Sequence, residues 1–354
     1  MKSNKHVVII TPGFPENESD ENCIPPLQQF IYYISKFNPD FKFSVIAIHY
    51  PYNKAQYKWN NINVYSCGGE NKKFPMRFII WNRVMKFFNQ IKKDRDIDII
   101  HSFWFGESAW LANKLCKKYN LPHICTLMGQ EINKRNRYLD YINDNDIVFT
   151  AISHSQLKSF YKIRGRKVDE TIPWGISETD KHNVYSDKTI DLVGVGSLTK
   201  LKNYELFINI VKSLKQNRSD IKAVIIGDGN ERAKLEKLIV SFSLQKNINL
   251  TGELKRSEVL EYMSRSKILL HTSSFESFGF VFAEALLNGL YIVSFNVGAS
   301  EPSERWIVAK DENDMIHNIE KLLSVSLNHQ PVNLFPLERT VEKYVQLYNR
   351  VISQ

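Results

Sequence analysis

The chain has 354 residues, of which 43% are hydrophobic and 24% are charged, a balance typical of a globular protein with two domains. It contains neither a membrane-spanning apolar run nor the long apolar region of a signal peptide, so we expect a cytoplasmic protein. The formal net charge of +9 favours anionic partners such as nucleotides, phospholipid surfaces or nucleic acid, although solvated surface lysines explain it equally well.

Short apolar runs alternate with longer amphipathic stretches in the first half of the chain. They predict strands at residues 6–12, 43–50, 97–103, 123–129 and 147–153, with a helix over 107–120. Apolar strands without polar alternation are buried on both faces, as in a parallel sheet. Strands that alternate with helices predict a doubly wound α/β domain, which we assign to residues 1–175.

A polar stretch follows, and we interpret residues 176–189 as a linker. The alternation then restarts, which predicts a second doubly wound α/β domain over residues 190–335. Its expected strands are 190–197, 222–229, 248–254, 267–274 and 290–298, and its expected helices are 203–217, 230–244 and 257–266. A final helix, at 336–354, is expected to pack back toward the N-terminal domain.

Within the second domain, the stretch Ser274–Gly289 combines an apolar helix with two carboxylates. Glu284 has apolar neighbours on every side, which is typical of a buried helix, and a buried carboxylate needs hydrogen-bond donors. Glu276 lies eight positions earlier, just ahead of the helix. Two interpretations remain open. Either Glu284 pairs with a buried lysine or arginine and Glu276 is a surface loop residue, or both face the hydroxyl groups of a ligand.

Several segments resemble the GT-B glycosyltransferases, in particular family 4, a group of retaining enzymes that use nucleotide-sugar donors. The similar segments are DIIHSFWFG (98–106), IPWGIS (172–177), VIIGDGNERAKLE (224–236) and the block from INLTGEL to LLNG (248–289). Glu276 and Glu284 match the E-x7-E motif of that last block. The resemblance covers nearly the whole chain. It implies two Rossmann-like domains facing across a cleft, the first binding the acceptor and the second the nucleotide sugar.

The resemblance also implies roles for residues of the second domain. Glu276 would face the transferred sugar, Glu284 the nucleotide ribose, and Lys202 the donor diphosphate, unless Lys202 is merely an exposed loop lysine. The other donor-binding candidates are Gly196, Ser197, Gly227, Leu254, Ser277, Phe278 and Gly279. The last three begin the apolar helix, where free backbone N–H groups and the helix dipole favour an anion such as a diphosphate.

Two positions depart from the family pattern. In the loop GSLTKLKN (196–203), Ser197 stands where the family has an arginine that grips the diphosphate, and Lys200 is a candidate to supply the missing charge. In TLMGQEIN (126–133), Met128 stands where members often have a histidine near the transferred sugar, and methionine is a weak hydrogen-bonding group. These departures leave open whether activity is reduced, whether the donor binds differently, or whether activity is lost.

The first domain offers further candidates. His101 lies at the carboxyl end of a strand, and we count it with Glu276 and Lys202 as a catalytic candidate, although a core histidine explains it equally. Trp104 would stack on a sugar ring, unless it belongs to an aromatic core. The acceptor-side candidates are Gly13, Trp104, Gln130 and Glu131.

The stretch 72–93 is rich in lysine, arginine and aromatic residues and contains no acidic residue. One interpretation is a basic amphipathic helix in peripheral contact with an anionic membrane. The other is a helix packed on the sheet with a solvated basic face.

Together these features predict a hexosyltransferase-type glycosyltransferase. It would move a sugar from a nucleoside-diphosphate sugar to a saccharide or lipid-linked acceptor in bacterial cell-surface polysaccharide or lipopolysaccharide synthesis. It would work in the cytoplasm or on the inner face of the plasma membrane, with no cofactor, no metal and no nucleic-acid partner. One alternative is an NAD(P)-dependent oxidoreductase, suggested by GVGSLT (194–199), which lacks the third glycine of G-x-G-x-x-G. Another is a basic non-catalytic binding module, suggested by charge alone.

Overall fold

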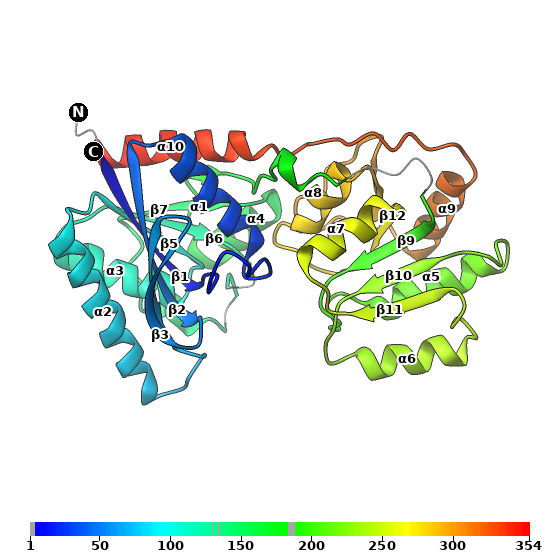
Figure 1. Ribbon diagram of the computed structural model, residues 1–354, viewed down its shortest axis with the longest axis horizontal. Coiled ribbons are helices and arrows are strands. Elements are labelled where there is room, and N and C mark those ends of the chain that lie inside the picture. The colour runs from blue at the N-terminus through cyan, green and yellow to red at the C-terminus, as the bar shows by residue number, and fades with distance from the viewer. Residues whose placement is uncertain (1–3, 130, 134, 183–187) are drawn as a thin grey trace. The chain divides into compact units, whose positions relative to one another are not determined.

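The computed structural model describes residues 4–129, 131–133, 135–182 and 188–354. Gln130, one of the acceptor-side candidates, lies outside these residues. The chain divides into two compact units, one made of residues 1–175 with 337–354, and the other of residues 176–336 (Figure 1). Each unit is an α/β domain, which confirms the predicted fold class.

The first unit is built on an eight-stranded sheet in which only the edge strand is antiparallel to its neighbour. In spatial order its strands are β3 (Lys54–Trp59), β4 (Ile62–Cys67), β2 (Phe41–Tyr50), β1 (Lys5–Gly13), β5 (Ile99–Phe103), β6 (His123–Leu127), β7 (Ile147–Ala151) and β8 (Glu170–Thr171). Its helices are α1 (Pro25–Phe37), α2 (Met76–Asp94), α3 (Glu107–Tyr119), α4 (His154–Arg164) and α10 (Leu337–Ile352), with a short 3₁₀ turn, η1 (Arg137–Asp140).

The β3–β4 hairpin is a feature that the sequence pattern does not predict. Strand β3 reads KAQYKW, and its exposed residues alternate with half-buried ones and the buried Trp59, so it lacks the apolar run expected of a central strand. Asn60 and Asn61 join the two strands with φ values of 45° and 66°, the left-handed pair that a tight hairpin turn requires. The hairpin therefore depends on its turn residues and on its edge position.

The second unit is built on a six-stranded, wholly parallel sheet. In spatial order its strands are β11 (Ile248–Gly252), β10 (Ala223–Ile226), β9 (Ile190–Val195), β12 (Ser266–His271), β13 (Tyr291–Ser294) and β14 (Trp306–Val308). Its helices are α5 (Tyr204–Lys215), α6 (Arg232–Ser241), α7 (Arg256–Ser264), α8 (Phe280–Leu287) and α9 (Glu312–Leu323), with a 3₁₀ turn, η2 (Glu178–Asp180).

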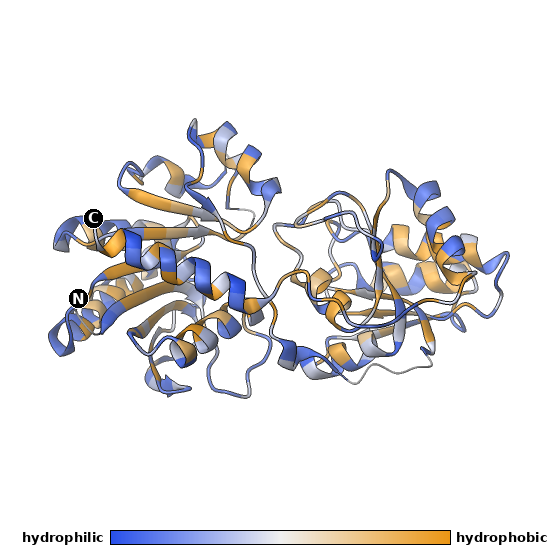
Figure 2. Ribbon diagram, turned by 90° about the horizontal axis from the view of Figure 1, so that it is seen from above, coloured by the Kyte–Doolittle hydropathy of each residue, from blue (hydrophilic) through white to orange (hydrophobic). Residues whose placement is uncertain are grey.

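Both faces of this second sheet are buried. The neighbouring residues Leu192 and Val193 of β9 belong to two different hydrophobic clusters, because successive strand side chains point to opposite faces. Phe207 of α5 lies in one cluster and Phe282 of α8 in the other. Figure 2 shows the corresponding concentration of hydrophobic residues on the strands and on one side of many helices.

Two segments at the boundary of the units have definite partners. Ile176 is fully buried against Ala283 and Leu287 of α8, so the start of the expected linker packs in the second unit. Helix α10 belongs to the first unit, where it packs on α1 with the rings of Phe30 and Tyr344 4.7 Å apart (Figure 1).

Candidate functional site

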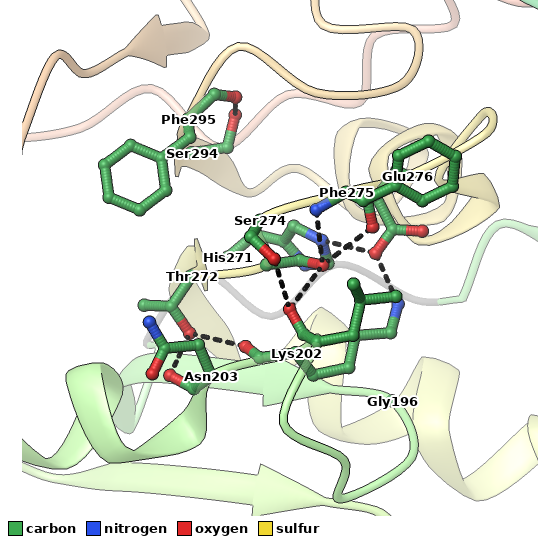
Figure 3. A network of polar contacts seen from close by, with 12 residues as sticks. Gly196, Lys202, Asn203, His271, Thr272, Ser274, Phe275, Glu276, Ser294 and Phe295 are labelled. Carbon is green, nitrogen blue, oxygen red and sulfur yellow. Dashed lines mark hydrogen bonds and ion pairs between the residues drawn. The ribbon is translucent and has the colours of Figure 1, made fainter. Parts of the chain in front are cut away.

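The centre of the candidate site is the Glu276 carboxylate, which follows strand β12 in the second unit. The Nζ atom of Lys202 forms an ion pair with Glu276 Oε1, and the Nε2 atom of His271 lies 2.9 Å from the same oxygen (Figure 3). The Glu276 side chain is only 13% exposed. The structure therefore brings Lys202 and Glu276 together, and Glu276 is not a surface loop residue.

Hydrogen bonds between two loops hold Lys202 in place. The hydroxyl group of Thr272 lies 3.0 Å from the carbonyl oxygens of both Lys202 and Asn203. The backbone N–H of Ser274 donates to the carbonyl oxygen of Leu201 over 3.0 Å. The loop after β9 and the loop after β12 are thus fastened together at the carboxyl edge of the sheet, where doubly wound folds bind ligands.

Two glycines allow the close packing of this site. Gly196 has a φ of 144°, and a Cβ atom there would lie 3.3 Å from Cε of Lys202, so a larger residue would press on the lysine. Gly279 has a φ of 79° and precedes the first residue of α8. A Cβ atom at Gly279 would lie 2.5 Å from the ring of Phe282. Helix α8 therefore begins directly after the Glu276 loop, and its first N–H groups have no acceptor within the helix.

The surroundings of Glu276 keep it ionised. Burial acts to raise the pKa of Glu276, but the His271 hydrogen bond and the charge of Lys202 outweigh it and lower the pKa to about 2. Burial also lowers the pKa of His271, against the opposing effect of Glu276. At neutral pH the site therefore holds a carboxylate and a lysine cation, and its histidine is neutral.

The second carboxylate of the motif, Glu284, has an internal partner. Nε of Arg256 lies 2.9 Å from Glu284 Oε1, and Nη2 of the same arginine lies 3.0 Å from Asp180 Oδ2. Burial raises the pKa of Glu284, although the Arg256 charge opposes this. Of the two interpretations of the buried carboxylate, the ion pair is present in the structure. A contact between Glu284 and a ribose stays a prediction.

The remaining donor-binding candidates belong to the same unit. Ser197 is exposed, Ser277 is half-buried, and Phe278 is buried. Leu254 packs against a hydrophobic cluster. Gly227 approaches the loop after β9 so closely that a Cβ atom there would lie 2.0 Å from the carbonyl oxygen of Gly196.

His101 must be corrected as a catalytic candidate. It is fully buried in the first unit, with Nδ1 2.7 Å from the hydroxyl oxygen of Tyr348 and Nε2 2.7 Å from the hydroxyl oxygen of Thr126. Burial lowers its pKa far below the usual value, so the ring is neutral. Both nitrogens are occupied and no surface is exposed, so His101 is a core histidine.

The other candidates of the first unit lie near the carboxyl ends of its strands. Trp104 has a φ of 68°, a strained conformation for a bulky residue, and it is half-buried between the fully buried Phe103 and Phe105. Gly13 is a buried residue at the end of β1. Glu131 accepts hydrogen bonds from the backbone N–H groups of Met128 and Gly129, at 2.5 and 2.6 Å, so it stabilises its own loop.

Three residues of the site escape the sequence-based predictions: His271, Arg256 and Asp180. His271 ends a strand five residues before Glu276, and its position at the carboxyl edge is the signal that would have indicated it. Arg256 and Asp180 carry no local signal, because Arg256 is 28 residues from Glu284 and 76 residues from Asp180 in the chain, and only the tertiary fold unites them.

Residues 176–324 match the model of a family described as glycosyl transferases group 1. The phosphatidylinositol N-acetylglucosaminyltransferase gpi3 subunit of Schizosaccharomyces pombe is 28% identical over 145 residues, which are 40% of this chain and 32% of that protein. The matched region is thus about a third of the relative's length.

Solved structures resemble the whole chain. Sucrose-phosphate synthase from Thermosynechococcus elongatus has a TM-score of 0.79 at 16% identity, covering 99% of this chain and 100% of that one. Anabaena HepE in complex with UDP and glucose has a TM-score of 0.70 at 12% identity, covering 98% and 100%. The second unit therefore matches the group 1 glycosyltransferase family over about two fifths of the chain, and the fold of the chain is that of GT-B glycosyltransferases.

Proposed function

We propose that this protein is a retaining glycosyltransferase that moves a sugar from a nucleoside-diphosphate sugar to a saccharide or lipid-linked acceptor. The observation that carries the proposal is the convergence of Lys202 and His271 on Glu276, directly ahead of the first turn of α8. A cation and free helix N–H groups suit a diphosphate, and an ionised carboxylate suits the hydroxyl groups of a sugar. The name of the fission yeast relative supports a lipid-linked acceptor, and a role in bacterial surface polysaccharide or lipopolysaccharide synthesis is part of the same proposal.

In this proposal the protein acts mainly on the leaving group. As the bond between the anomeric carbon and the diphosphate oxygen breaks, negative charge grows on that oxygen, and Lys202 with the α8 N-terminus stabilises it. The acceptor oxygen bonds to the same carbon from the face that the leaving group departs, and the proton of the acceptor hydroxyl group passes to the departing diphosphate oxygen. Glu276, with its pKa of about 2, remains an anion and orients the sugar through its hydroxyl groups instead of donating a proton.

Binding of UDP tests the proposal against the oxidoreductase alternative. In the structure GVGSLT does not open directly into a helix, since α5 begins only at Tyr204. We expect UDP at about a hundredfold its Kd to raise the Tm of the protein by roughly 5–10 °C, because only the native state binds it. Differential scanning calorimetry with UDP, GDP and NADH checks this. Stabilisation by NADH alone would overturn the transferase proposal, and a screen of nucleotide sugars for hydrolysis and transfer then identifies the donor.

On helix α2, the surface that is available for a membrane contact is smaller than the whole stretch 72–93. Its long apolar face is buried in the first unit through Ile80, Val84, Phe87, Phe88 and Ile91. Large apolar side chains are exposed only where the helix begins: Phe74 (70%), Met76 (45%), Phe78 (50%) and Ile79 (44%). We call these four residues the apolar tip. In the described part of the chain, no helix has the length and apolar character needed to cross a bilayer.

We propose that the apolar tip, flanked by the exposed Lys72 and Lys73, contacts an anionic membrane surface. The double change Phe74→Ser and Phe78→Ser is expected to lower binding to vesicles containing about a third anionic lipid by at least about tenfold, since each phenylalanine loses a contribution of roughly 1.5–3 kcal/mol. Co-sedimentation measures the effect. The matched control is Tyr161→Ser, which changes an exposed aromatic residue on α4. Equal binding by the double variant and the control would contradict the contact.

A further inference from the structure

A group of cationic and ring side chains gathers around Tyr291, the first residue of β13 in the second unit. The guanidinium carbon of Arg305 lies 4.7 Å from the centroid of the Tyr291 ring. The ring of His329 lies nearly perpendicular to it, with the two centroids 6.2 Å apart. One aromatic ring thus supports both an arginine and a histidine.

Lys188 belongs to the same group, because Lys188 and His329 contact two consecutive backbone carbonyl oxygens. Its Nζ atom donates to the carbonyl oxygen of Asn288 over 3.0 Å, and His329 Nδ1 lies 2.8 Å from the carbonyl oxygen of Gly289. Because the acceptors are neighbours in the chain, Lys188 and His329 lie close together. We call Lys188, Arg305 and His329 the cationic cluster.

Two members of the cationic cluster are buried cations. Lys188 is 8% exposed and Arg305 is 9% exposed, yet among the described residues neither forms an ion pair with a carboxylate. The nearby Lys267 differs, because Asp191 Oδ1 lies 2.7 Å from its Nζ atom. Buried cations are normally paired, because desolvation without a partner is costly. Burial, together with the Arg305 charge, lowers the pKa of Lys188 to about 8, which reports the same cost.

The cationic cluster is separate from the candidate donor site. Lys188 precedes β9, Tyr291 begins β13, and Arg305 directly precedes β14, so these residues lie at the amino ends of parallel strands. Lys202 and Glu276 follow the carboxyl ends of β9 and β12. Strands of four to six residues place the two edges roughly 13–20 Å apart.

We propose that Lys188, Arg305 and His329 bind a small tetrahedral oxyanion, a phosphate group, at the amino edge of the second sheet. The cluster combines a planar guanidinium, an ammonium group and an imidazole, which are donors that suit phosphate oxygens. Its burial favours a small ligand over a nucleic acid or an acidic peptide. Inorganic phosphate and a phosphate monoester share this chemistry. The inference does not depend on the proposed transferase activity.

Calorimetry of the full chain tests the proposal, with Lys202→Ala as the parent so that the candidate donor site does not contribute. We expect sodium phosphate, several-fold above its Kd, to raise the Tm of this parent by roughly 2–4 °C over sodium chloride of equal ionic strength. Adding Arg305→Gln should abolish that rise, and adding Arg265→Gln, a change at an exposed arginine of the same unit, should preserve it. Repeating the titration with glycerol phosphate distinguishes a monoester from free phosphate.

The stability of the variant without phosphate separates a binding site from a structural role. If Arg305 belongs to an anion-binding site, Arg305→Gln removes an uncompensated buried cation. The Tm of the variant in chloride should then equal or exceed the Tm of the parent. A lower Tm in chloride together with an unchanged phosphate response would overturn the proposal and assign Arg305 to packing on Tyr291. Should Arg305→Gln fail to fold, Lys188→Gln serves as the second variant, with the same loss of the phosphate response expected.

Discussion

Replacing Lys202 with alanine is expected to lower kcat/KM for sugar transfer by about 10²- to 10³-fold, the effect of losing one charge-stabilising group at a leaving oxygen. Lys202 is expected to be the main cation of its loop that contacts the diphosphate. Ser197 stands where similar enzymes have an arginine, and Lys200 is exposed on the loop while Lys202 is held against Glu276. The loss should therefore fall on the diphosphate itself and weaken binding of UDP as well as turnover.

The comparison variant for this measurement is Lys237→Ala, which removes an exposed lysine of the same unit on α6. Initial rates with the donor identified by the nucleotide-sugar screen, together with calorimetric titration of UDP, give both quantities. A Lys202→Ala protein with kcat/KM within about threefold of the Lys237→Ala protein would show that the diphosphate is held elsewhere, because one lost stabilising group costs at least a hundredfold.

Replacing Arg256 with alanine is expected to destabilise the protein by about 3 kcal/mol, which lowers the Tm by roughly 6–12 °C. The change leaves Glu284 and Asp180 close to each other, and Glu284 is buried without a donor. Most of the destabilisation arises because the Glu284 carboxylate stays buried without its partner, and the lost attraction within the ion pair contributes less. Calorimetry or urea unfolding measures the difference.

The chain offers a closely matched control in Arg232. This arginine also contacts two carboxylates, Asp228 and Glu236, but those side chains are 50% and 52% exposed, whereas the carboxylates of Asp180 and Glu284 are 15% and 11% exposed. Arg232→Ala should cost at most about 1 kcal/mol, because water replaces the lost charge. Similar costs for the two arginines would contradict the burial argument. A partial rescue of Arg256→Met by Glu284→Gln would support it.

The sequence was most informative where burial dictates composition. Apolar runs such as residues 6–12 and 43–50 predict parallel strands because both faces of those strands are covered, and the structure confirms the α/β class. The amphipathic β3 escapes prediction, because an edge strand that is half exposed shows no apolar run. The expected linker is similar: its polar composition conceals Asp180, which contacts the half-buried Arg256.

Only the part of the candidate site that lies on the loops after β9 and β12 could be predicted from the sequence. Lys202 and Glu276 are 74 residues apart, yet each follows the carboxyl end of a strand in one parallel sheet, so their proximity follows from topology. His101 shows the opposite case. Its position also satisfies that rule, but Tyr348, 247 residues later in the chain, covers the His101 ring. The hydroxyl group of Tyr348 forms a hydrogen bond with Nδ1 of His101. No local pattern contains that information.

The return of α10 to the first unit has a consequence for biosynthesis. Residues 176–336 can leave the ribosome and fold as a complete sheet while the first 175 residues still lack Tyr344 and Tyr348, which pack against His101. The half of the protein that is translated first is therefore the half that is finished last. Until α10 has left the ribosome, the core around His101 stays open to water and to chaperones.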